Sequence, residues 1–425
     1  MTAFPEYAFP SQHTLFDSSD GYTFNIGAPA QHFLKDAAIL MKEATVKKLD
    51  EEINVHQGRL LQYGAACGAR DYLEAVRNFL ADQYQDDNVD VQNLVQTAGA
   101  TTALIILLNQ MFPQKTTVYF EQLSYFLAAK ILKSVGFECK GVDTGSTGID
   151  LEDLEKRLQE DTDMTTIEEK RKDRVYSSVI YVVPIYQNPI GVVLSAEKCQ
   201  KLVALARKYN SLVFCDDVYN MLHYDGTVQK RLFAYDNKND KDYGNGHVVS
   251  NGTFSKILAP GLRLGWMELP KAIKDKYFYK SDILVSSGSL NTYTGGIVAE
   301  LLKDGKAKAQ VEKIRNEQKL KMEILLNELD QHLPKDCSII AKPDGGYFVQ
   351  VLVPPRVNCV DFVAKIKESH KILLHDGRKF VPDDRTNYKH PEYANSIRLC
   401  IAFIETDKIA EGIRIFCSEV DNYGR

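Results

Sequence analysis

The sequence predicts an α/β fold: a large domain with a mixed, mostly parallel sheet flanked by helices, and a smaller α+β domain beside it. Two observations lead to this prediction. From about residue 70 onward, helical patterns alternate with short runs of strand-forming residues, and this alternation is typical of parallel sheets. Several of the runs are apolar at every position, as expected for strands that are buried on both faces.

The elements expected before residue 300 follow in order. Residues 1–50 are predicted to form an irregular arm and then a helix from Gln31 to Leu49. The candidate strands of the sheet are the segments 117–121, 177–183, 211–215 and 247–250. A helix is expected from Ser195 to Tyr209, because serine is a good N-cap residue. Its apolar residues recur at helical spacing, at Cys199, Leu202, Val203 and Ala206.

The pattern changes after about residue 300. A long charged helix is predicted over 303–332, with strands at 347–351 and 396–400 after it. The polar stretches 159–174, 225–246 and 376–395 are expected to be surface excursions within domains. We therefore expect three parts: residues 1–50, which contribute to the small domain, 51–300, the large domain, and 301–425, the small C-terminal domain.

Composition and charge exclude several classes of protein. The 425 residues are 44% hydrophobic and 26% charged, which excludes a disordered or collagen-like chain. A net charge of −5 gives no basic field for nucleic acid or an anionic membrane. No apolar run approaches the roughly 20 residues of a membrane span, and no signal peptide is evident. We expect a cytoplasmic protein whose partners include neither nucleic acid nor membrane.

The cysteines and histidines also carry information. The eight cysteines are scattered, without a Cys-x-x-Cys pair, and no His-Glu-x-x-His motif occurs. This favours a reducing compartment and gives no support for a metal site.

The most informative stretch is residues 251–266. Lys256 follows a turn that contains Thr253 and Ser255, and Arg263 comes seven positions later. Hydroxyls and a planar guanidinium can hold a phosphate. A nearby cation and an apolar wall would lower the pKa of a lysine and make it nucleophilic. The pattern fits a Schiff-base lysine beside a phosphate site, although a lone Ser-x-Lys is more often a solvated surface turn.

Three other motifs support this interpretation together, although each has an ordinary structural explanation. The segment 186–191, Tyr-Gln-Asn-Pro-Ile-Gly, follows a strand and is a good turn. Asp216, Asp217 and Tyr219 lie at the carboxyl end of a buried strand, the edge at which ligands of open α/β sheets bind. The segment 97–102 introduces a helix whose free N–H groups could bind an anion.

In their order and spacing these motifs resemble the fold-type I pyridoxal-phosphate enzymes, specifically the class I/II aminotransferases. The resemblance extends from about Asn25 to the C-terminus, and its most specific part is the block 253–265. The block, the Gln-Asn-Pro-x-Gly turn and the Ser-Ile-Arg-Leu segment at 396–399 are most similar to the 2-aminoadipate/kynurenine aminotransferase branch and its fungal-type relatives. The resemblance makes 51–300 the cofactor-binding domain.

The resemblance implies a role for each matching residue. Lys256 would bind pyridoxal 5′-phosphate as a Schiff base and move the proton between the substrate Cα and the cofactor. Asp216 would pair with the pyridine nitrogen and keep it protonated. Asn188 and Tyr219 would hydrogen-bond the ring oxygen, and Tyr125 would stack on the ring. Catalytic roles are thus expected for Lys256, Asp216 and Tyr219.

The remaining implied contacts involve the phosphate and the substrate. The phosphate would be held by Ala100 and Thr101 through their backbone and by Thr253, Ser255 and Arg263. Tyr63 would reach the phosphate of a neighbouring subunit, which implies a homodimer. Arg398 would clamp the substrate α-carboxylate, unless it pairs with a local acid. Gly27, in the segment 25–29 that closes over the substrate, and Asn188 complete the expected substrate contacts.

The sequence departs from the family pattern at three places. Leu123 replaces a proline, Ile190 replaces the threonine of Asn-Pro-Thr-Gly, and 100–102 reads Ala-Thr-Thr. Small geometric effects are expected from the first two, because neither residue would transfer a proton.

The expected function is transfer of an amino group from an L-amino acid, 2-aminoadipate or an aromatic or kynurenine-type donor, to 2-oxoglutarate. A lyase or synthase of the same fold shares these motifs and stays an alternative. The aminotransferase-like bacterial transcription regulators are disfavoured, because only about 25 residues precede Asn25 and no basic recognition helix is evident. A dicarboxylic substrate would need a second cation, for which Arg378 is a candidate, although a loop arginine of this kind is more often solvated.

Overall fold

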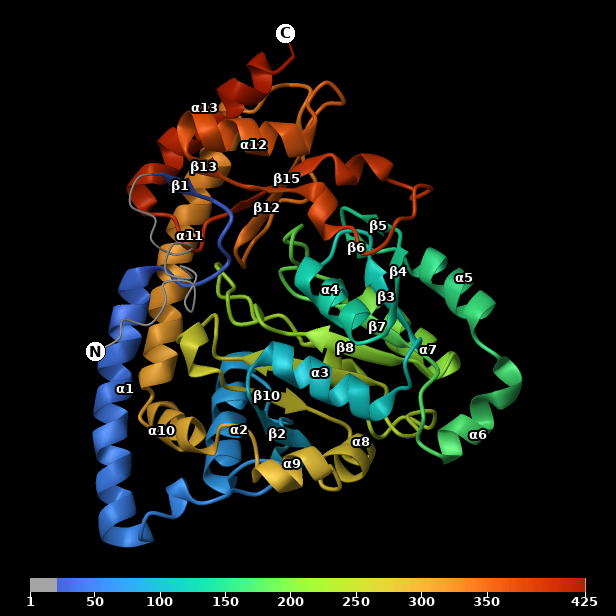
Figure 1. The fold of residues 1–425 in the computed structure, drawn as a ribbon, viewed down its shortest axis with the longest axis vertical. Helices are drawn as coiled ribbons and strands as arrows, with labels where there is room; N and C mark the ends of the chain where they lie inside the picture. The colour runs from blue at the N-terminus through green and yellow to red at the C-terminus, as the bar shows by residue number, and fades with distance from the viewer. Residues whose placement is uncertain (1–20, 425) are drawn as a thin grey trace, which may run out of the picture.

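The computed structural model describes residues 21–424, and the remainder of the predicted arm, residues 1–20, lies outside the described residues. Its centre is a seven-stranded sheet in the order β2-β10-β9-β8-β7-β3-β4 (Figure 1). The strands are β2 (Leu94–Thr97), β3 (Thr117–Glu121), β4 (Glu138–Val142), β7 (Val179–Val182), β8 (Leu212–Asp216), β9 (Val248–Thr253) and β10 (Gly265–Glu268). Only β10 runs antiparallel to its neighbours within this sheet. The predicted mixed, mostly parallel sheet is confirmed.

Helices cover both faces of this sheet. They are α2 (Arg70–Tyr84), α3 (Ala100–Met111) and α4 (Phe126–Ser134) on one side, and α5 (Leu151–Asp161) and α7 (Ala196–Lys208) on the other. Along β3, Val118 and Phe120 pack with the first group of helices, whereas Tyr119 packs with the second. Side chains of a strand alternate between faces, so strands that are apolar throughout satisfy two cores at once.

A smaller antiparallel sheet lies above the large one in Figure 1. Its order is β11-β12-β15-β14, with β11 (Ser338–Ile339), β12 (Phe348–Leu352), β14 (His375–Asp376) and β15 (Ser396–Cys400). Helices α11 (Lys306–His332), α12 (Cys359–His370) and α13 (Thr406–Asn422) share its core. Strand β1 (Tyr22–Thr23) pairs in parallel with β13 (Ile372–Leu373), which brings the N-terminal segment to this layer. The predicted α+β part is therefore present, and its boundaries at 50 and 300 stay predictions.

Two further helices are long: α1 (Gln31–Glu51), which runs beside α11 (Figure 1), and α10 (Thr292–Lys303). The other helices and strands are short: β5 (Thr144–Gly145), β6 (Gly148–Ile149), α6 (Ile167–Lys172), α8 (Lys271–Ile273) and α9 (Asp282–Ser287).

One sequence-based expectation needs correction, one polar stretch proves to be helical, and one expectation is confirmed in detail. The long helix predicted over 303–332 begins only at Lys306, because Gly305 has a φ of +72° and separates it from α10. The polar stretch 159–174 is largely helical, since it holds the end of α5 and all of α6. Ser195 caps α7 as predicted, with its side chain accepting a hydrogen bond from the backbone N–H of Lys198.

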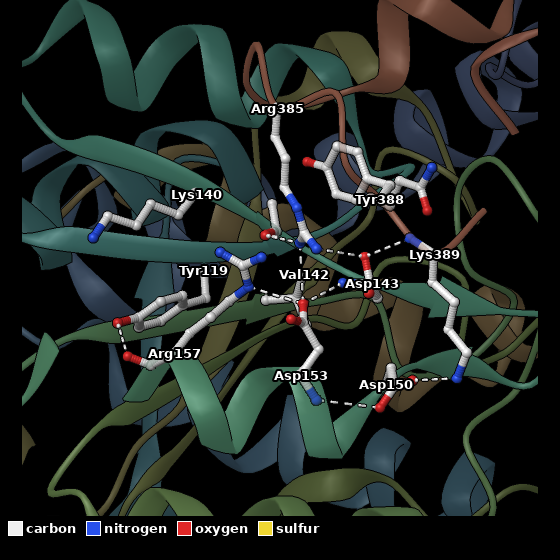
Figure 2. A network of polar contacts seen from close by, with 12 residues as sticks. Tyr119, Lys140, Val142, Asp143, Asp150, Asp153, Arg157, Arg385, Tyr388 and Lys389 are labelled. Atoms are coloured by element: carbon white, nitrogen blue, oxygen red, sulfur yellow. Dashed lines mark hydrogen bonds and ion pairs between the residues drawn. The ribbon is translucent and has the colours of Figure 1, made fainter. Parts of the chain in front are cut away.

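The polar stretch 376–395 is anchored to the edge of the large sheet by an ionic network (Figure 2). The guanidinium of Arg385 lies 3.0 Å from an oxygen of Asp143 and 3.1 Å from one of Asp153. Asp153 also pairs with Arg157 at 2.8 Å, and the Lys389 backbone N–H donates to Asp143. The segment that connects β14 to β15 is thereby held against β4 and α5.

Two further features concern residues 21–424 as a whole. None of the helices within residues 21–424 is both long and apolar enough to cross a membrane. All eight cysteines lie in the described part, all are free thiols, and all but Cys337 are buried. Cys199 and Cys215 lie in the core, as their apolar surroundings in the sequence predict.

Candidate active site

Lys256 follows β9 and lines a cavity of about 320 Å³ between the two sheets. Its ammonium donates a 2.6 Å hydrogen bond to the carbonyl of Gly27. Burial lowers the pKa of this amine to about 8, with nearby Arg398 and Arg263 acting in the same direction and Cys400 and Asp216 opposing it. The amine therefore loses its proton far more readily than a surface lysine, as a nucleophile or proton acceptor requires.

The cavity brings together nearly all the residues that the sequence pointed to. Twelve predicted site residues line it: Gly27, Ala100, Thr101, Tyr125, Asn188, Asp216, Tyr219, Thr253, Ser255, Lys256, Arg263 and Arg398. They come from segments spread over the chain from 27 to 398, and β8 and β9 meet here at their carboxyl ends. Tyr63 and the candidate second cation, Arg378, lie elsewhere.

Asp216 is the last residue of β8 and is buried. One carboxylate oxygen, Oδ2, accepts a 2.5 Å hydrogen bond from the Tyr181 hydroxyl. The other, Oδ1, has no partner within the described residues. Burial raises the pKa of Asp216 to about 6, while Tyr181, Lys256 and Asn251 oppose that rise. At neutral pH the carboxylate is mostly ionised, and one of its oxygens is left for a cationic donor.

A group of anion-binding donors surrounds the start of α3. Gly99, the N-cap, has a φ of +86°, and a Cβ there would come within 2.8 Å of the Arg263 guanidinium. The Thr253 hydroxyl donates to that of Ser255 at 2.9 Å and accepts from the Ser255 backbone N–H at 3.1 Å. Free helix N–H groups, two hydroxyls and a guanidinium are the donor set that a phosphate prefers.

Arg398 lies on β15 with its guanidinium 4.5 Å above the ring of Phe348. It donates to the Asn188 side-chain oxygen at 2.9 Å and to the Asn25 carbonyl at 2.6 Å. Its Nε has no partner, and no Asp or Glu within residues 21–424 pairs with it. A buried guanidinium without an acidic partner is strongly stabilised by binding a carboxylate, which neutralises its charge.

The three tyrosines predicted to contact the cofactor, Tyr63, Tyr125 and Tyr219, differ in their surroundings. Tyr219 is buried, with its ring edge-on to Tyr347 and Phe348 at 5.6 and 5.4 Å between centroids. Tyr125 precedes α4, and burial raises the pKa of its phenol to about 12, so the hydroxyl stays protonated. Tyr63 is 80% exposed and does not line the cavity. Its predicted contact therefore requires a second subunit.

Comparison with known proteins agrees with this geometry. The family model described as aminotransferase class I and II matches residues 27–416. The chain belongs to this family. It is an aminotransferase, and its fold is that of the fold-type I enzymes.

Curated relatives and solved structures resemble the chain over most of its length. Aromatic-amino-acid aminotransferase 1 of Thermococcus litoralis is 27% identical over 94% of this chain and 88% of its own. The 2-aminoadipate transaminase of Thermus thermophilus is 26% identical over 92% of this chain and 88% of its own. The kynurenine aminotransferase structure from Pyrococcus horikoshii superposes with a TM-score of 0.77 at 24% identity, covering 99% of this chain and 97% of that one.

The aminotransferase cavity also contains residues that the sequence analysis did not single out, among them Phe126, Tyr181, Asn251, Phe348 and His375. Asn251 pairs directly with Asp216 in the β8–β9 register, and it opens the block that contains the lysine, so register reasoning could have found it. Phe126, Tyr181 and Phe348 are core-type residues without a local signal. His375 directly precedes a polar stretch that carries no motif. The weak candidate Arg378 is exposed and does not line the cavity.

Proposed function

We propose that this aminotransferase uses pyridoxal 5′-phosphate to transfer the amino group of an L-amino acid, 2-aminoadipate or an aromatic or kynurenine-type donor, to 2-oxoglutarate. The observation that carries the proposal is the convergence of Lys256, Asp216 and Arg398 with the start of α3 on one buried cavity. The substrates named for the relatives support this choice of donors.

The donor set fits the cofactor. The N–H groups at Ala100 and Thr101 and the side chains of Thr253, Ser255 and Arg263 would hold the phosphate. The partnerless oxygen of Asp216 suits a protonated ring nitrogen. Asn188 and Tyr219 would hydrogen-bond the ring oxygen, and Tyr125 would pack on the ring. When bound, the cofactor supplies an electron sink for the bonds at the substrate Cα.

Each reacting group of the protein has one task in this proposal. Lys256 would hold the cofactor through its amine and would move a proton at the substrate Cα, for which its lowered pKa suits it. Asp216, ionised near neutral pH, would favour a protonated ring nitrogen. Arg398 binds the α-carboxylate through its guanidinium and so orients the Cα–H bond toward the lysine.

The segment 25–29 covers these groups. The carbonyl of Asn25 accepts from Arg398, and the carbonyl of Gly27 accepts from Lys256. The first contact is to the guanidinium that would bind the substrate and the second is to the amine that would bind the cofactor, so both ligands compete with this segment. This position supports the proposed role of the segment in closing the site and excluding water.

A homodimer forms part of the proposal. An apolar patch follows α1 and consists of Ile53, Val55, Leu61 and Tyr63, each more than 60% exposed. Exposed apolar groups of this kind mark interaction surfaces. We propose that this patch binds a second copy and that Tyr63 thereby reaches the partner's phosphate site. The division of the chain at residues 50 and 300 and the cytoplasmic location also remain proposals.

An absorbance spectrum tests the function. Protein loaded with pyridoxal 5′-phosphate and then dialysed should keep a visible band from the linkage to Lys256, which Lys256→Ala should lack. Addition of 2-aminoadipate, kynurenine or phenylalanine alone should replace the band by near-ultraviolet absorbance, and 2-oxoglutarate should restore it. Release of pyruvate or of a leaving group without this reversal would contradict transamination.

A further inference from the structure

The cavity has to accept two different side chains in turn if the proposed function holds. The lysines and arginines that line it within residues 21–424 are Lys256, Arg263 and Arg398, and each already has a role. The unassigned wall includes Leu104, Phe126, Leu127, Ile131 and His375. The side chain of an apolar amino acid fits such a wall. The distal carboxylate of the acceptor, 2-oxoglutarate, needs a hydrogen-bonding N–H or O–H group there.

His375 is the polar residue among these five and lies beside the proposed carboxylate site. It pairs with Arg398 in the antiparallel β14–β15 register. Directly opposed residues of antiparallel strands project from the same face, about 5 Å apart at Cβ. The imidazole is edge-on to Phe126, with 5.7 Å between ring centroids and 69° between planes. His375 and Phe126 therefore line the cavity next to Arg398.

One contact of His375 bears on which nitrogen carries its proton. Nδ1 lies 3.4 Å from the ammonium of Lys379, a group that can only donate, so this contact favours the tautomer with the proton on Nε2. Burial lowers the pKa of His375 to about 3, and the nearby charges of Arg398 and Lys379 act in the same direction. The ring is thus neutral, and its Nε2–H has no partner within the described residues.

We propose that His375 determines side-chain specificity by serving both substrates: its ring packs against an aromatic or apolar donor side chain, and its Nε2–H donates to the distal carboxylate of 2-oxoglutarate. This inference rests on the proposed function. A fixed cation at this position would be left buried and unpaired by an apolar donor, whereas a leucine would leave the carboxylate unbonded. A neutral imidazole avoids both costs.

The test compares two acceptors that differ only in the distal carboxylate. Full-length, cofactor-loaded wild type, His375→Leu and His375→Gln are assayed for kcat/KM with 2-oxoglutarate and with 2-oxopentanoate, using one donor. His375→Leu should lower the ratio of 2-oxoglutarate to 2-oxopentanoate about tenfold or more, as loss of a hydrogen bond to a charged group does. His375→Gln should stay within about threefold, because an amide can still donate. His370→Leu, on α12 and outside the cavity, is the control.

A binding measurement that needs no turnover accompanies the assay. Calorimetry should show that His375→Leu weakens glutarate about tenfold relative to pentanoate, in parallel with the kinetic ratio. An unchanged ratio in His375→Leu would overturn the inference and assign the distal carboxylate to another group. An equal loss with both acceptors would also overturn it and indicate a structural role. If wild type transfers no amino group, the proposed function fails, and glutarate binding still decides the role of His375.

Discussion

The Tyr181 hydroxyl donates a 2.5 Å hydrogen bond to Oδ2 of Asp216, and Oδ1 of the same carboxylate is buried without a partner within residues 21–424. The hydrogen bond stabilises the ionised form and opposes the burial that raises the pKa of Asp216 to about 6. Tyr181, on the neighbouring strand β7, therefore helps to keep Asp216 charged near neutral pH and leaves one oxygen free for a ligand.

Tyr181→Phe is expected to shift the acid limb of the profile of kcat/KM against pH to higher pH. Without the hydroxyl, the pKa of Asp216 rises above about 6, by roughly one unit for the loss of one such bond. The acid limb of kcat/KM against pH should shift accordingly. Tyr119→Phe, which removes a similar 2.6 Å hydrogen bond to Asp161 on the other face of the sheet, should leave the limb in place. An unmoved or lowered limb in Tyr181→Phe would contradict this.

Lys256→Met should stabilise the cofactor-free protein at pH 7 while abolishing turnover. The folded-state pKa of Lys256 is about 8, below its ordinary value of 10.5. Between these two pKa values the unfolded chain binds more protons than the folded one. The free energy of unfolding of the wild type therefore rises with pH, because burial of a charged lysine no longer destabilises the folded state. In denaturant unfolding, the free energy of unfolding of the variant should exceed that of wild type by about 3 kcal/mol at pH 7. Near pH 10 the difference should be much smaller.

The matched control for that experiment is Lys201→Met, at a lysine that lies 64% exposed on α7. It should change stability by less than about 0.5 kcal/mol at either pH. A gain in Lys256→Met that is equally large at pH 7 and pH 10 would mean that packing, rather than the buried charge, is responsible.

Much of the site could be predicted because its groups lie where local sequence signals are strong. Lys256 and Arg263 share one block, and Asp216 ends a strand that is apolar on both faces. In a parallel sheet such strand ends meet at one edge, so residues far apart in the chain converge. Their roles remain predictions, but their convergence on one cavity is observed.

The cavity wall could not be predicted in the same way. Tyr181 and Phe348 lie in strands in which any large apolar side chain satisfies the pattern. His375 becomes part of the site only through its pairing with Arg398, 23 positions later in the chain. These assignments depend on strand register and packing, which periodicity alone does not define.

Arg231→Met is expected to destabilise the fold strongly without changing the active site. Arg231 holds the polar stretch 225–246 against the sheet through two hydrogen bonds of 2.8 and 2.9 Å to Glu268, and both side chains are almost fully buried. Loss of the guanidinium leaves the Glu268 charge buried and unpaired, which should lower the free energy of unfolding by about 3–5 kcal/mol. Denaturant unfolding measures this loss. Arg231→Met with Glu268→Met should recover part of it, and a larger loss in the double variant would contradict the explanation.

Arg385→Met should weaken substrate binding through the segment that it anchors. Arg385, 14% exposed, joins the 376–395 stretch to Asp143 and Asp153 (Figure 2), and this stretch connects β14 to the strand that carries Arg398. Removal should cost about 1–2 kcal/mol of stability, since the network is partly solvated. Steady-state kinetics should show KM rising several-fold for 2-oxoglutarate and 2-oxopentanoate alike, because the α-carboxylate contact that both share is loosened. Lys389→Met, at a 61% exposed member of the network, should leave KM within about twofold. A selective effect on 2-oxoglutarate in Arg385→Met would instead place Arg385 with the distal carboxylate and contradict its anchoring role.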